Sequence, residues 1–116
     1  MKALRSSEVR LYRSAFQPKT TQEAWLAEWR KSERGDKDAA ARIARAYLRG
    51  DGDIAADSSR YEGWLQYAAA LGNGVACYEL AVWCRRQDQP VPAAQYESRA
   101  RDLGYTPPTS LDNQRK

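Results

Sequence analysis

The fold is decided by residues 39–72, which read AAARIARAYLRGDGDIAADSSRYEGWLQYAAALG. Both halves of this stretch are rich in alanine and poor in β-branched residues, a composition typical of helices. Glycines end each half, at Gly50-Asp51-Gly52 and at Gly72, and Asp57 is well placed to cap the second half. We therefore predict two antiparallel helices joined by a short turn.

Glycine, proline and capping residues also divide the rest of the chain into helical segments. We expect five helices. Thr20 or Thr21 caps the first, which runs to Arg34, Asp36 caps the second, which runs to Arg49, and Asp57 or Ser58 caps the third, which ends near Leu71. The fourth runs from about Gly74 to Arg86 and the fifth from about Val91 to Leu103. Residues 1–17 fit a sixth helix or a short strand, and we favour the helix because no second strand exists to pair with it. The sequence predicts one all-α domain over residues 1–105 and a flexible, proline-containing tail at 106–116.

The helices repeat along the chain. The helices predicted in residues 35–72 form one pair, and those in residues 73–104 form the next. Four, eight and eleven residues before its terminal glycine, the second helix of the first pair has Ala68, Trp64 and Tyr61. The second helix of the next pair has Ala100, Tyr96 and Ala93 at the same distances. The first helices align as well, with Ala39, Ile43-Ala44 and Tyr47 matched by Ala76, Leu80-Ala81 and Cys84. Alternating large and small side chains let neighbouring helices interlock. Helix pairs that repeat at this period stack into an α-solenoid.

Residues 35–72 resemble one Sel-one-like repeat, a relative of the tetratricopeptide repeat. The resemblance rests on a small-residue helix, a Gly-x-Gly turn, an aspartate cap, and a Trp with paired alanines before glycine: Ala39, Ile43-Ala44, Tyr47, Gly50-Asp51-Gly52, Asp57, Trp64, Ala68-Ala69 and Gly72. The turn has one extra residue, because Asp53 precedes Ile54. Residues 73–105 are a shortened repeat without this turn, and 1–34 hold a degenerate repeat. The resemblance implies a tetratricopeptide-like superhelix that acts as a protein-interaction scaffold, frequently bacterial, with no chemistry of its own.

Catalytic and metal sites have little support in the composition. The chain has no histidine, the commonest general base and metal ligand. Cys77 and Cys84 stand about 10 Å apart on one predicted helix, too far for a disulfide with each other, and are interpreted as core thiols. Asp51, Asp53 and Asp57 are interpreted as turn and cap residues rather than calcium ligands. We expect no catalytic residue, no metal, no cofactor and no enzyme activity.

The charge balance favours a protein partner. The formal net charge is +4, with the excess in residues 1–34, but acidic residues are interleaved almost everywhere and no nucleic-acid motif is recognised. Nucleic acid is therefore less favoured than an acidic protein surface. No apolar run approaches the roughly 20 residues that span a bilayer, and the first ten residues lack the apolar stretch of a signal peptide. We expect a cytoplasmic protein, unless a leader was removed.

In solenoids of helix pairs, the first helices usually line the concave surface. The side of these helices opposite the aligned stripe holds the predicted partner-binding residues Arg42, Arg45, Arg49, Tyr78, Glu79, Trp83 and Arg86. Trp and Arg dominate binding hot spots because both desolvate well. The arginines also fit a solvated face on which they pair with Asp36, Asp38 and neighbours. Trp83 also fits a place beneath the tail, and Trp25 and Trp29 are expected to pack against residues 1–17.

The sequence thus favours a non-catalytic module that binds an acidic protein partner through its concave helix face. One form of that role is a bacterial immunity protein, or a chaperone or adaptor, for a toxin or secreted effector. The alternative is a structural subunit or a homo-oligomeric scaffold that uses the ends of the stack. The oligomeric state and the identity of the partner stay open.

Overall fold

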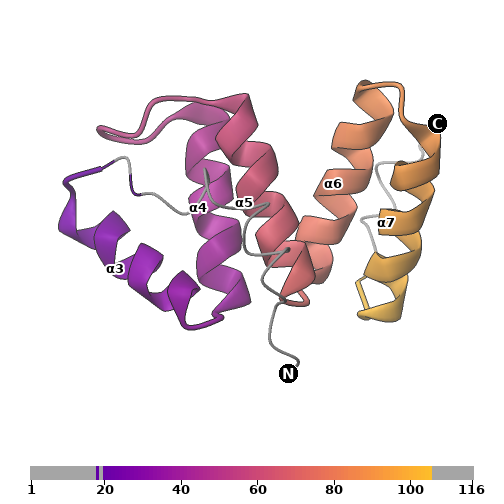
Figure 1. Cartoon of the computed structure of the whole chain (residues 1–116), viewed down its shortest axis with the longest axis horizontal. Helices are drawn as coiled ribbons and strands as arrows, with labels where there is room; N and C mark the ends of the chain where they lie inside the picture. Colours follow the sequence, from indigo (N-terminus) through magenta and orange to yellow (C-terminus); the bar gives the residue numbers. More distant parts are fainter. Residues whose placement is uncertain (1–17, 19, 106–116) are drawn as a thin grey trace.

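The computed structural model describes residue 18 and residues 20–105. Within them five helices follow one another, each antiparallel to the one before and packed against it (Figure 1). Their bounds are α3 Glu23–Glu33, α4 Lys37–Arg49, α5 Ser58–Ala70, α6 Gly74–Arg86 and α7 Pro90–Asp102. The predicted all-α class is confirmed. The predictions for residues 1–17 and for the tail at 106–116 lie outside the described residues.

Side-chain caps begin three of the helices. A carboxylate oxygen of Asp36 accepts hydrogen bonds from the backbone N–H groups of Asp38 and Ala39, both at 3.0 Å. Asp57 caps α5 in the same way, and the side-chain oxygen of Asn73 accepts from Ala76 N–H at 2.7 Å to cap α6. Each cap satisfies backbone donors that a helix start otherwise leaves without a partner. The predicted caps Asp36 and Asp57 are confirmed.

The predicted cap of α3 is wrong. The helix begins at Glu23, and Gln22 precedes it without a side-chain cap. The hydroxyls of Thr20 and Thr21 instead donate to the Asp53 carboxylate in the turn between α4 and α5, and the Thr21 N–H donates to the same group at 2.8 Å. The two threonines therefore fasten the chain to a residue more than thirty positions away, which no local pattern indicates.

A repeated turn links each second helix to the element that follows it. Gly35, Gly72 and Gly104 end α3, α5 and α7 with φ values of 92°, 106° and 87°, a region that residues with a Cβ rarely adopt. After each glycine, the next backbone N–H bonds to the carbonyl five residues earlier: Asp36 to Lys31, Asn73 to Ala68 and Tyr105 to Ala100. The same backbone geometry thus follows α3, α5 and α7, and it occurs once more after α6, where Asp88 has a φ of 60° and the Gln89 N–H bonds to the Cys84 carbonyl.

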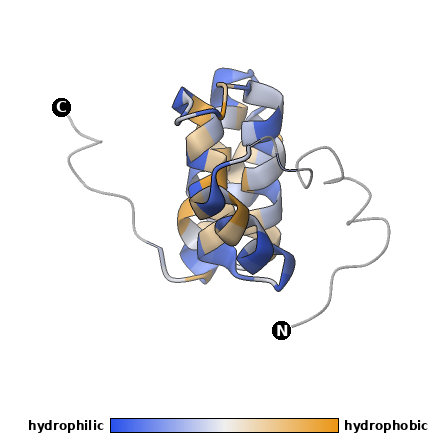
Figure 2. Cartoon of the chain, turned by 90° about the vertical axis from the view of Figure 1, so that its left-hand side faces the viewer, coloured by the Kyte–Doolittle hydropathy of each residue, from blue (hydrophilic) through white to orange (hydrophobic). Residues whose placement is uncertain are grey.

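The two aligned stripes form the core. All the matched residues of α4 and α6 are buried: Ala39, Ile43, Ala44, Tyr47, Ala76, Leu80, Ala81 and Cys84. Trp64 and Ala68 of α5 and Ala100 of α7 are no more than 2 % exposed. Figure 2, which looks along the row of helices, shows hydrophilic and hydrophobic residues on the same helices. The apolar stripes face the neighbouring helices, and this burial is the main force that holds the row together.

One side-chain contact is repeated between the second helices. The Tyr67 hydroxyl of α5 donates to the Ser32 carbonyl of α3 at 2.7 Å. The Arg99 guanidinium of α7 donates to the Ala69 carbonyl of α5 at 3.3 and 3.4 Å. Tyr67 and Arg99 each stand five residues before the terminal glycine of their helix, while Ser32 and Ala69 each stand three before theirs. Successive second helices are therefore tied at equivalent positions.

Replacing Tyr67 by phenylalanine tests this tie. The hydroxyl is buried and the Ser32 carbonyl keeps its bond from Gly35 N–H, so we expect Tyr67→Phe to lower the free energy of unfolding by about 1 kcal/mol. Urea denaturation measures the change. The control is Tyr105→Phe, since the Tyr105 ring packs on Tyr78 and its hydroxyl bonds to no described residue. Equal effects of the two substitutions would contradict the prediction.

The Asp36 cap predicts a pH dependence of stability. The hydrogen bond from Ala39 N–H, assisted by that from Asp38 N–H and by nearby Arg42 and Lys31, lowers the pKa of Asp36 below its ordinary 3.8. Its charged form therefore stabilises the fold above that pH, and the contribution is lost as the pH falls through the lowered folded-state pKa. Asp36→Asn keeps an acceptor that does not titrate. We expect the stability difference between wild type and Asp36→Asn to shrink between about pH 5 and about pH 2 in urea titrations. A constant difference would rule the effect out.

Candidate functional site

Residues of three helices gather around the Tyr61 ring. Tyr61 of α5 meets Trp83 of α6 edge to face, with ring centroids 5.6 Å apart and planes at 76°. Arg45 of α4 reaches across to α6, where its Nε lies 3.5 Å from Glu79 Oε2. Arg86 follows Glu79 and Trp83 at seven and three residues, on the same side of α6. We call Arg45, Tyr61, Glu79, Trp83 and Arg86 the Tyr61 cluster.

Three charged side chains act on the Tyr61 hydroxyl. Burial raises the pKa of Tyr61, and the Glu79 carboxylate raises it further, whereas Arg86 and Arg45 lower it. Tyr61 is only 6 % exposed, while Trp83, whose ring meets it edge to face, is half-buried. The cluster thus presents two cations and one anion beside a partly exposed aromatic surface.

Glu79 is incompletely satisfied in this cluster. Its Oε1 is buried and accepts no hydrogen bond from any described residue, and its Oε2 reaches Arg45 only at 3.5 Å. The neighbouring pair on the same side of α4 is much better formed. Arg42 Nε and Nη2 both donate to Glu28 Oε1 of α3, at 3.0 and 2.9 Å, and this hydrogen bonding raises the pKa of Arg42. The two ion pairs therefore differ in geometry.

Two arginines of the predicted site occupy equivalent places. Arg49 and Arg86 are the last residues of α4 and α6, which run in the same direction, and they stand 37 residues apart, as do Gly35 and Gly72. A cation is favourable at the carboxyl end of a helix. Both side chains are exposed, and neither forms an ion pair with a residue that the structure describes. Their charges are therefore uncommitted within the described chain.

Tyr78 lies apart from the Tyr61 cluster. Its ring contacts Tyr105, with centroids 5.5 Å apart, on the side of α6 that faces α7. A surface hollow of about 200 Å³ opens beside this pair, lined by Tyr78, Glu97, Ala100, Arg101 and Tyr105. The predicted contact of Trp83 with the tail lies outside the described residues.

The structure thus groups Arg45, Glu79, Trp83 and Arg86, places Arg42 against α3, and leaves Arg49 at the end of α4. Tyr61 is not among the predicted site residues, because its spacing assigns it to the interlocking stripe. No local pattern predicts Glu28 as the partner of Arg42. Pairing α3 with α4 as an antiparallel hairpin is the signal that brings residues 28 and 42 together, because both lie a similar distance from the turn at Gly35.

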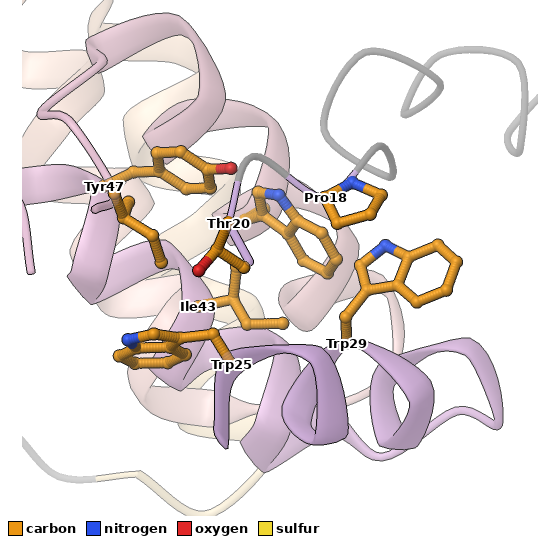
Figure 3. A pocket seen from close by; sticks show the side chains of 8 residues that line it. Pro18, Thr20, Trp25, Trp29, Ile43 and Tyr47 are labelled. Atoms are coloured by element: carbon orange, nitrogen blue, oxygen red, sulfur yellow. The ribbon is translucent and has the colours of Figure 1, made fainter. Parts of the chain in front are cut away.

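Two tryptophans of α3 pack against α4 and α5. Trp25 and Trp29 are half-buried, and with Pro18, Thr20, Ile43, Tyr47, Ile54 and Trp64 they line a narrow apolar hollow (Figure 3). Both rings belong to the edge of the core cluster. Their predicted contact with residues 1–17 lies outside the described part of the chain.

The acidic turn has a structural role. Asp53 holds Thr20 and Thr21, Asp57 caps α5, and the backbone of Asp51 pairs with that of Ile54 across the turn, at 2.9 Å in both directions. The predicted turn and cap roles are confirmed. Within the described residues, no group of three or more His, Cys, Asp or Glu side chains is arranged to hold a metal ion. None of the described helices is long and apolar enough to traverse a bilayer.

The chain has no significant similarity to any family model, curated protein or solved structure with which it was compared. The resemblance to Sel-one-like repeats therefore rests on the residues of this chain alone.

Burial predicts that both thiols are unreactive in the native protein. Cys77 and Cys84 are free and only 0 % and 6 % exposed, and burial raises the pKa of each thiol. Because the thiolate is the reactive form, we expect slow labelling by a disulfide reagent at pH 7.5 and rapid labelling of both cysteines in denaturant. Fast labelling of either thiol in the folded protein would overturn the interpretation as core residues.

Proposed function

We propose that the chain is a short α-solenoid of the Sel-one-like type, which binds a partner protein without catalysing a reaction. Three features support the repeat. The turn after each second helix recurs at Gly35, Gly72 and Gly104, and the contact between second helices recurs in α5 and α7. The aligned stripes are buried except for Tyr96, which is half-buried. Such a stack leaves one side of its first helices, here α4 and α6, available to a partner.

The Tyr61 cluster is the observation that carries the binding role. It joins a half-buried tryptophan to arginines from two helices, and these two residue types are enriched in binding hot spots. Trp83 offers apolar area at the surface, while arginine recognises carboxylates with two parallel hydrogen bonds. With Arg49 and Arg86 uncommitted, an acidic segment of a partner protein fits this face best.

Neutralisation of a toxin, or escort of a secreted effector as a chaperone or adaptor, is a form of this role that suits so small a module. This role is proposed by analogy with other compact interaction proteins, whereas the contacts of the Tyr61 cluster support the binding of a partner. Co-expression with a candidate toxin tests the immunity role directly. If the cells still die, the chain is not an immunity protein for that toxin.

A homo-oligomeric scaffold is the second candidate. The surface of α7 carries the exposed polar residues Gln95, Ser98, Arg101 and Asp102, but Val91 at its start is 67 % exposed and Leu103 after its end is 41 % exposed. A terminal repeat with a fully polar outer face closes a solenoid, and these two apolar side chains leave association through α7 open. Light scattering of the purified protein separates the candidates, because the scaffold role requires an assembly larger than one chain.

Charge reversal at Arg49 and Arg86 tests the binding face. Both side chains are exposed, so we expect the double variant Arg49→Glu/Arg86→Glu to fold, with a small loss of stability because it places anions at two helix carboxyl ends. We expect its affinity for the partner to fall at least about tenfold, because two charge-assisted contacts are lost. Captured proteins are compared by quantitative mass spectrometry between wild-type and variant baits from the source cells.

The matched control reverses two other exposed arginines, Arg34→Glu/Arg101→Glu, and keeps the net charge of the two double variants equal. Because these two arginines also lie at helix carboxyl ends, similar unfolding midpoints of the two double variants show that both fold equally well. A partner captured equally by wild type and Arg49→Glu/Arg86→Glu would place the binding surface elsewhere.

A further inference from the structure

We propose that Glu79 occupies, from within the chain, the position against Arg45 that a carboxylate of the acidic partner segment takes on binding. Glu79 then acts as an internal competitor that weakens the binding of acidic segments. This inference rests on the proposed function, because it concerns the same face and the same class of partner. Three features of the Tyr61 cluster support it.

The first feature is the geometry of the Arg45–Glu79 pair. Its single contact is 3.5 Å long, and no hydrogen bond joins the two side chains. Arg42, three residues earlier on the same helix, donates two hydrogen bonds to Glu28 at 3.0 and 2.9 Å. Both arginines are exposed to a similar degree, at 46 % and 43 % of the side chain. Solvent access therefore does not explain the difference, and the donors of Arg45 stay open to a better-placed carboxylate.

The second feature is the state of the Glu79 carboxylate itself. A buried carboxylate oxygen without a donor loses its water and gains nothing in exchange. The side chain is 30 % exposed, so rotation about its own torsions carries the carboxylate toward solvent, where water satisfies it. The displacement of Glu79 from Arg45 consequently removes a poor contact rather than a good one.

The third feature is the surrounding charge and apolar surface. With Glu79 turned away, Arg45 and Arg86 flank the Tyr61–Trp83 pair without an intervening anion. A segment with a carboxylate for each arginine and an aliphatic or aromatic side chain for Trp83 complements that arrangement. The occupant is thus an acidic segment with an apolar anchor, and a basic segment is disfavoured by the same two cations.

The test compares Glu79→Gln with the matched variant Glu28→Gln. Each removes one negative charge from the same side of the molecule, so a general effect of net charge appears equally in both. The probe is a fluorescein-labelled, end-blocked peptide of four glutamates and two leucines, and fluorescence anisotropy at low salt gives its dissociation constant. We expect Glu79→Gln to bind about three- to fivefold more tightly than the wild type, the size of one half-exposed ion pair, with Glu28→Gln within about twofold.

Urea denaturation gives a second readout that does not depend on the probe. We expect Glu79→Gln to unfold at the same urea concentration as the wild type or a higher one, because it replaces a poorly satisfied charge, and Glu28→Gln to unfold at a lower one. A lower midpoint for Glu79→Gln, or tighter peptide binding by Glu28→Gln than by Glu79→Gln, would overturn the competitor role.

The outcomes also separate this inference from the proposed function. If Arg49→Glu/Arg86→Glu abolishes peptide binding while Glu79→Gln leaves it unchanged, the acidic-partner function stands and the competitor role is wrong. If wild type and Glu79→Gln both fail to bind at millimolar peptide, the competitor role and the acidic-partner proposal are both wrong. The same peptide with glutamines in place of glutamates serves as the negative control for charge recognition.

Discussion

The close approach of helices over alanine is the constraint on which the rest of the structure depends. Ala39 and Ala44 of α4, Ala68 of α5, and Ala76 and Ala81 of α6 are all fully buried. A methyl group at each point of contact lets the backbones come together, while larger neighbours such as Trp64 and Leu80 fill the space between the contacts. Because this spacing is short, side chains reach from one helix to the next but one, as Arg45 of α4 does to Glu79 of α6.

The side-chain contacts between the first helices, α4 and α6, differ from those between the second helices, α3, α5 and α7. Between the second helices the contacts end on backbone carbonyls, Tyr67 on Ser32 and Arg99 on Ala69, which have fixed positions and no alternative conformations. Between the first helices the contact joins two flexible side chains and leaves Glu79 Oε1 without a donor. Buried polar groups that have hydrogen-bond partners stabilise a fold. Buried polar groups that lack a partner occur most often where a protein binds a ligand. The difference supports the proposal that the binding face lies on α4 and α6 rather than on the opposite side.

Local chemistry explains why most helix ends were predictable. Asp36 and Asp57 cap helices through N–H groups two or three residues away, and Gly50 and Gly72 end helices through their own backbone conformation. The predicted start of α3 is wrong because a distant residue, and not the local sequence, binds the two threonines. Thr20 and Thr21 have the composition of caps, but the Asp53 carboxylate lies in another turn and binds both of them. A long-range acceptor prevailed over a local one, and only packing brings it within reach.

The sequence alone determined the all-α class, the alanine and aromatic stripes and the arginine-bearing side of the first helices, because each depends on helical periodicity or on a cap within a few residues. Tertiary structure decided which charges are already paired. Arg42 pairs with Glu28, whereas Arg45 has only a 3.5 Å contact with Glu79. Tyr78 packs on Tyr105, and Tyr61 lies against Trp83 in the candidate site. These partners come from different helices, so their distances follow from how the helices pack and are absent from any single helical pattern.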